Sequence, residues 1–195
     1  MNTSDRVLVL LVAISGVLGC HRGREKRSDH PSSASPVYDV PRTVDPIAID
    51  GKCLETSWRT AFRSPLFTDS HGRPVPFTQI FATATSDTLY LAVYVGDVDV
   101  RTNDEVRLDV GSLHIVTRPR GAVAPPGVKL AVDTDATIDD PSHDDEEWIT
   151  EIAIPWSLLG TRTPTIRAFR IDVGHGEPHA LAWPPYSTAT LRFHG

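Results

Sequence analysis

The sequence predicts an all-β protein, an antiparallel β-sandwich of roughly nine short strands with one short helix. Apolar and polar residues alternate along many short segments, which is the pattern of half-buried strands. Sixteen prolines and thirteen glycines among 195 residues suit turns between such strands. No segment has the strand–helix–strand spacing that a parallel sheet requires.

The first 19 residues predict a signal peptide. Arg6 precedes an apolar run over residues 7–19, which is too short to span a bilayer. The run ends in V-L-G-C at Cys20 and resembles the lipobox of bacterial lipoproteins, in which the cysteine carries lipid. An ordinary secretory signal is the alternative, and mass spectrometry of the mature N-terminus distinguishes the two. The resemblance implies a lipid-anchored, extracytoplasmic protein of the bacterial cell envelope.

Residues 20–39 are expected to form a lipidated, disordered tether, because residues 21–36 contain almost nothing apolar. The folded domain is expected over residues 40–195. The formal net charge is −6, and the basic residues at 21–30 lie outside this domain, so nucleic acid is not expected as a partner. With Cys20 lipidated, Cys53 has no disulfide partner and is expected to be a small buried side chain.

The first half of the domain predicts a short strand over residues 46–50, a turn at Asp50-Gly51 and a helix over residues 54–62. Trp58 falls on the apolar face of this helix and is expected in the core. Residues 78–96 predict a hairpin that turns at Ser86-Asp87. Tyr90 and Tyr94 lie on the face of this hairpin opposite the core.

The strand over residues 148–154 has the clearest alternation in the second half. Pro155 ends it, and residues 157–159 predict a single helical turn that leaves through Gly160. Further strands are expected over residues 104–110, 113–118, 128–133, 166–173 and 189–193. In the strand over 148–154, one face carries Trp148, Thr150, Ile152 and Ile154, and the other carries Ile149, Glu151 and Ala153.

Acidic residues gather over residues 133–147 with no lysine or arginine among them. Asp133, Asp135 and Asp139 are the candidate ligands for calcium, which prefers oxygen ligands. A solvated acidic loop is the alternative. The order of residues excludes an EF-hand, because Ile138 stands where that loop needs glycine. His175, Glu177 and His179 form a weaker candidate for a transition metal.

The sequence contains no recognisable catalytic motif, so an enzyme is not expected.

Six segments together resemble the family 9 carbohydrate-binding modules and their DOMON-like relatives. In order they are I-D-G-K-C-L-E-T-S-W (49–58), S-D-T-L-Y-L-A-V-Y-V-G-D (86–97), D-E-V-R-L-D-V (104–110), W-I-T-E-I-A-I-P-W (148–156), F-R-I-D (169–172) and A-W-P-P (182–185). The resemblance implies a β-sandwich that binds the ends of sugar chains between two aromatic side chains, often with calcium ions.

The aromatic clamp of that family is not preserved here. Arg101 to Asp104 stand where the first tryptophan is expected, and Tyr186 is the nearest aromatic residue to the second. The expectation is therefore a weakened carbohydrate site near Trp183, Tyr186 and Arg101, with the Tyr90 and Tyr94 face as an alternative location. A structural or protein-interaction sandwich of the cell envelope without sugar affinity is the rival function.

Overall fold

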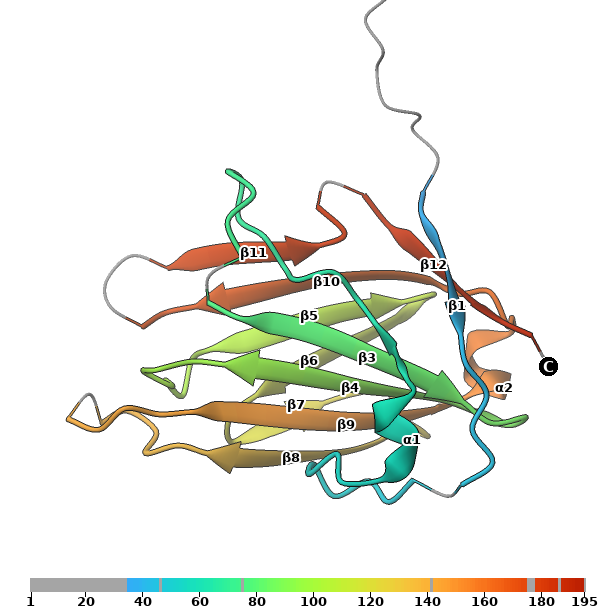
Figure 1. Cartoon of the computed structure of the whole chain (residues 1–195), viewed down its shortest axis with the longest axis horizontal. Coiled ribbons are helices and arrows are strands. Elements are labelled where there is room, and N and C mark those ends of the chain that lie inside the picture. The colour runs from blue at the N-terminus through green and yellow to red at the C-terminus, as the bar shows by residue number, and fades with distance from the viewer. Residues whose placement is uncertain are drawn as a thin grey trace, which may run out of the picture. The chain divides into compact units, whose positions relative to one another are not determined.

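The computed structural model describes residues 35–194, except residues 46, 75, 141, 175–177 and 186. Cys20, the signal peptide and most of the tether lie outside the described residues. Two sheets face each other in a sandwich (Figure 1). Sheet A has the order β1 (Val37–Val40), β12 (Ala189–Phe193), β10 (Thr165–Asp172), β5 (Glu105–Val110), β6 (Leu113–Arg118) and β7 (Gly121–Val123), and β11 (His179–Trp183) also pairs with β10. Sheet B has the order β2 (Phe62–Arg63), β3 (Thr78–Ala84), β4 (Thr88–Gly96), β9 (Glu147–Pro155) and β8 (Lys129–Asp135).

The core lies between the two sheets, where the inward positions of both are apolar. Trp148, Thr150, Ile152 and Ile154 of β9 are all inaccessible to solvent, as the alternation predicted. Their neighbours on β4 are Leu89, Leu91, Val93 and Val95, which are also fully buried. Val106, Leu108 and Val110 of β5 face them from sheet A. The all-β fold and these strand registers are confirmed.

The described part of the chain has twelve strands and two short helices, rather than nine strands and one helix. The additional strands β1, β2, β7 and β11 have between two and five residues each, so any periodic pattern in them is short. The strand expected over residues 46–50 is absent from residues 47–50. The expected helix is only α1 (Thr56–Arg59), since Phe62 already belongs to β2.

The start of the folded part was also predicted too late. Residues 37–39, assigned to the tether, belong to β1, which pairs in parallel with β12. Arg192 donates to both carboxylate oxygens of Asp39, at 2.6 and 3.1 Å. The C-terminal strand therefore orders residues that are polar and uninformative by themselves. α2 (Trp156–Leu159) follows Pro155 and ends at Gly160, which adopts a left-handed conformation (φ 65°) as expected.

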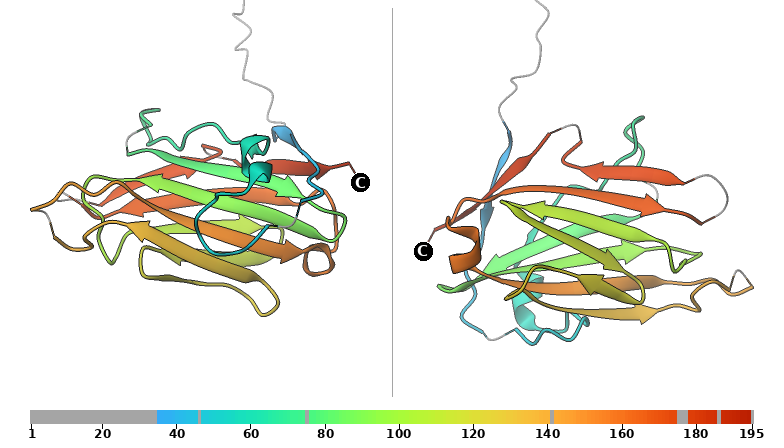
Figure 2. Two further views of the ribbon diagram at one scale, coloured as in Figure 1. Left: turned by 60° about the horizontal axis from the view of Figure 1, so that its bottom comes forward. Right: turned by 180° about the vertical axis from the view of Figure 1, so that it is seen from behind.

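The segment that contains α1 covers part of the outer face of sheet B (Figure 2). Trp58 packs there with Ile47 on Ala92 of β4, and it is buried as predicted. Glu151 of β9 is fully buried beneath this segment. Its carboxylate accepts hydrogen bonds from the backbone N–H groups of residues 50, 51 and 53 and from the Trp58 indole. Glu151 thus fastens the N-terminal segment to the sheet.

Gly51 is required where this segment approaches the sheet. Its φ is +90°, and a Cβ atom there would lie 2.5 Å from the backbone nitrogen of Asp133.

No helix among the described residues is long and apolar enough to cross a membrane.

Candidate functional site

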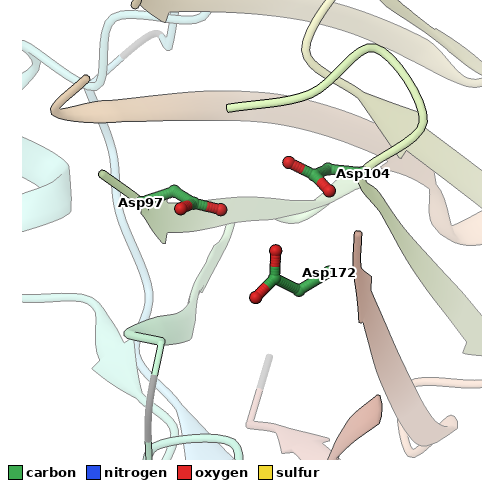
Figure 3. Close-up of side chains that lie close together, drawn as sticks. All are labelled: Asp97, Asp104 and Asp172. Atoms are coloured by element: carbon green, nitrogen blue, oxygen red, sulfur yellow. The ribbon is translucent and has the colours of Figure 1, made fainter. Parts of the chain in front are cut away.

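Three buried aspartates converge at one end of the sandwich (Figure 3). Asp97 follows β4, Asp104 precedes β5, and Asp172 ends β10. One carboxylate oxygen from each lies within 4.8 Å of the others. The three residues are 8%, 0% and 8% exposed, respectively. Their convergence brings together residues from three separate parts of the sequence.

Arg170 lies beside these aspartates because β10 directs alternate residues inward. Ile166, Ala168 and Arg170 are all fully buried. One terminal nitrogen of Arg170 pairs with Asp97 and lies 3.8 Å from Asp172. The other donates to the carbonyls of Phe77 and Gly96 and to the hydroxyl of Thr78, at 3.1 to 3.2 Å. Arg170 therefore joins both sheets to the acidic cluster.

Backbone donors hold the carboxylates in position. Asp104 accepts hydrogen bonds from the backbone N–H groups of Val173, at 2.8 Å, and Arg101, at 2.7 Å. Asp97 accepts from Asp99, and Asp172 accepts from Gly174. Each donor lies on a neighbouring loop or on the residue's own loop. The three carboxylates therefore also stabilise the conformation of these loops.

The cluster has an excess of negative charge. Three carboxylates and the one guanidinium of Arg170 leave a formal charge of −2 if all four groups are ionised. Burial raises the pKa of Asp104 to about 6, and the charges of Asp172 and Asp97 add to this effect. A buried excess charge is costly unless a proton or a cation compensates it. The convergent hard oxygen atoms fit the ligand chemistry of calcium.

A hollow of about 920 Å³ opens next to the cluster. Asp97 and Asp172 reach its wall, together with Asp69, Glu146 and His179. The rim includes Phe77, whose side chain is 40% exposed, and two prolines, Pro74 and Pro76. The hollow thus combines an exposed aromatic ring with several hydrogen-bond acceptors.

Of the site that was expected around Trp183, Tyr186 and Arg101, the structure describes Trp183 and Arg101. Trp183 is only 1% exposed and packs in the core, with its ring 5.8 Å from that of Tyr38. It cannot offer its face to a ligand, so its assignment to the carbohydrate site was wrong. Arg101 is paired with Asp99 through two contacts of 2.7 Å. Tyr186 lies outside the described residues.

The expected calcium ligands also lie apart from the cluster. Asp133 and Asp135 are exposed on β8. Asp139 accepts hydrogen bonds from the backbone N–H and hydroxyl of Thr102. These three residues are not among the carboxylates that converge in the described part of the chain.

Cys53 is half-buried, and burial together with nearby Glu151 raises the pKa of its thiol. Of the three residues expected to form a transition-metal site, the structure describes only His179, which is exposed.

Sequence reasoning missed Arg170, Asp172, Asp97, Asp104 and Phe77. The signal was present in the F-R-I-D segment, where Arg170 and Asp172 continue the inward phase of Ile166 and Ala168. Charged residues at inward positions indicate a buried polar site. Their partners could not be found in the same way, because they lie in loops.

The fold is shared with solved carbohydrate-binding modules. A family 9 module from Caldicellulosiruptor kristjanssonii in complex with glucose matches with a TM-score of 0.59 and 12% identity, over 82% of this chain and 96% of that one. A structure of a family 9 module from the same organism with cellotriose gives 0.54 and 11%, over 82% and 94%. A protein from Bacteroides uniformis ATCC 8492 gives 0.54 and 14%, over 83% and 100%.

No protein-family profile and no curated protein matches the sequence. The structural likeness confirms the predicted resemblance at the level of the fold.

Proposed function

We propose that the domain is a non-catalytic carbohydrate-binding module and that its site is the hollow beside Asp97 and Asp172. The observation that carries this proposal is the exposed ring of Phe77 at the rim of a carboxylate-lined hollow. Sugar rings present flat C–H patches that stack on aromatic faces, and their hydroxyl groups donate to fixed acceptors. The fold supports the proposal, because the family 9 modules of similar structure were solved with glucose and cellotriose.

The domain would act at the bacterial cell envelope, held there by lipid on Cys20. This location rests on the sequence alone. The rival function is a protein-interaction or structural sandwich without sugar affinity. The two functions differ in one measurable property, the binding of free saccharides.

Titration of the full chain with mono- and oligosaccharides of glucose, xylose and mannose tests the proposal. We expect dissociation constants of the order of millimolar, which correspond to about −4 kcal/mol. Phe77→Ala should weaken binding by roughly tenfold, because it removes a stacking contact of about 1 to 1.5 kcal/mol. Isothermal titration calorimetry measures both values.

Val123→Ala is the matched control, because Val123 is 64% exposed on β7 and does not line the hollow. It should bind as the unmodified chain does. If no saccharide binds the unmodified chain, the carbohydrate proposal fails, and a protein-interaction or structural function becomes the better hypothesis.

We also propose that Asp97, Asp104 and Asp172 hold a calcium ion, because their buried charge exceeds what Arg170 neutralises. Saturating calcium should then raise the melting temperature relative to chelator. At one hundred times the dissociation constant, the gain is about 2.7 kcal/mol. Asp172→Asn should abolish this gain.

Asp133→Asn serves as the control for the calcium experiment, since Asp133 is exposed on β8. Loss of the calcium effect in this variant would instead support the site expected from the sequence. An equal melting temperature in chelator and millimolar calcium would show that the cluster is compensated without calcium.

A further inference from the structure

We infer that the ligand is an oligosaccharide of several units, which continues from the hollow onto an aromatic strip on the outer face of sheet B. We define this strip by Phe77, Phe81 and Tyr94, with Arg63 and Gln79 between them. The inference rests on the proposed function and adds the length of the ligand to it.

The hollow and the strip are continuous. Phe77 and Gly96 line both the hollow and a shallow depression that also contains Arg63, Gln79, Phe81 and Tyr94. A third depression shares Arg63, Phe81 and Tyr94 with the second and extends toward Lys52 and Ile149. A ligand seated in the hollow can therefore continue past Phe77 and Gly96 onto the sheet.

The strand register explains why these side chains share one face. Gln79 and Phe81 alternate with the inward residues of β3, and Phe77 precedes them in the same phase. Tyr94 of β4 lies directly opposite Gln79. Phe81 is four residues further along the chain than Phe77, which is about 14 Å of extended backbone. This length exceeds a single pyranose ring, so the strip suits consecutive sugar units.

The side chains of the strip combine stacking surfaces with polar groups. The rings of Phe77 and Tyr94 meet edge to face, with centroids 5.5 Å apart. The guanidinium of Arg63 lies 5.0 Å from the centroid of Phe81. Gln79 donates to the carbonyl of Ser64 at 2.5 Å, which fixes its amide and leaves its oxygen as an acceptor. Alternating rings and polar groups match the alternating faces and hydroxyl groups of a sugar chain.

The N-terminal segment covers only part of this outer face. Trp58 and Ile47 pack on Ala92, with Tyr90 alongside. Tyr94 is two residues further along β4 and lines both shallow depressions instead. Among the described residues, its hydroxyl has no hydrogen-bond partner. The part of this face around Phe77 and Tyr94, which adjoins the hollow, is therefore not covered by this packing.

Chain-length dependence tests the inference on the full protein. The probes are glucose, xylose and mannose, each with its β-1,4-linked trimer and hexamer, measured by calorimetry. We expect affinity to rise at least tenfold from monomer to hexamer for the sugar that binds. Tyr94→Ala and Arg63→Ala should remove this gain. Arg63→Ala should also leave monomer binding unchanged, because Arg63 does not line the hollow.

Tyr90→Ala is the matched control, since Tyr90 lies on the same strand and the same face. It should retain the gain with chain length. Equal affinity for monomer and hexamer would overturn the inference and leave the proposed function in place. The same holds if Tyr94→Ala and Arg63→Ala keep the gain. Failure of every saccharide to bind would overturn both.

Discussion

Ile152→Asp is expected to unfold the domain. Ile152 lies at the centre of β9, between β4 and β8, and is inaccessible to solvent. An aspartate there would place an unpaired charge in the core and would remove apolar contacts. Changes of this kind cost more than about 3 kcal/mol, which is a large part of the stability of a small domain. Circular dichroism during thermal unfolding measures the effect.

Ile149→Asp is the control for the register of β9. Ile149 is on the outer face of the same strand and is partly exposed, so its replacement should cost much less. A cooperative melt near that of the unmodified chain for Ile152→Asp, with a severe loss for Ile149→Asp, would mean that the two faces are exchanged.

Glu151→Gln is the second change with a large expected effect, although it preserves the shape of the side chain. Both carboxylate oxygens of Glu151 accept two hydrogen bonds each, and all four donors are N–H groups. The amide nitrogen of glutamine would face two of these donors and could accept from neither. Two lost charge-assisted hydrogen bonds cost about 3 kcal/mol or more together. Urea unfolding followed by fluorescence measures the loss.

Glu147→Gln is the matched control on the same strand and the same face. The carboxylate of Glu147 accepts no hydrogen bond from the described residues. The same substitution there should therefore cost less than about 0.5 kcal/mol. Equal effects in the two variants would show that the hydrogen bonds of Glu151 do not hold the N-terminal segment in place.

The long strands could be predicted from the sequence because their burial follows a period of two residues. Every apolar inward position of β4 and β9 was assigned to the correct face. The same rule placed the side chain of Glu151 on the outer face of the sheet, and this assignment is correct. It could not show that the residue is buried, because the covering segment lies about 100 residues earlier in the chain.

The candidate site was predicted poorly because its geometry depends on loops and on distant neighbours. Asp97 and Asp104 lie in loops, and nothing in their local sequence distinguishes them from surface aspartates such as Asp87. Trp183 was expected near the ligand, whereas packing against Tyr38 and Phe62 buries it. Tyr38 belongs to β1, a strand with no periodic signal. The core around Trp183 was therefore invisible in the sequence.

The hydrogen bonds of Glu151 also determine the order in which the chain can fold. They join Glu151 to Asp50, Gly51 and Cys53 across 98 to 101 residues of sequence. Contacts of such separation form late, because the entropy of closing a long loop must be overcome first. Synthesis proceeds from the N-terminus, so Trp58 is made well before β9 exists to receive it. The residues that are synthesised first in this domain are thus among the last to reach their final position.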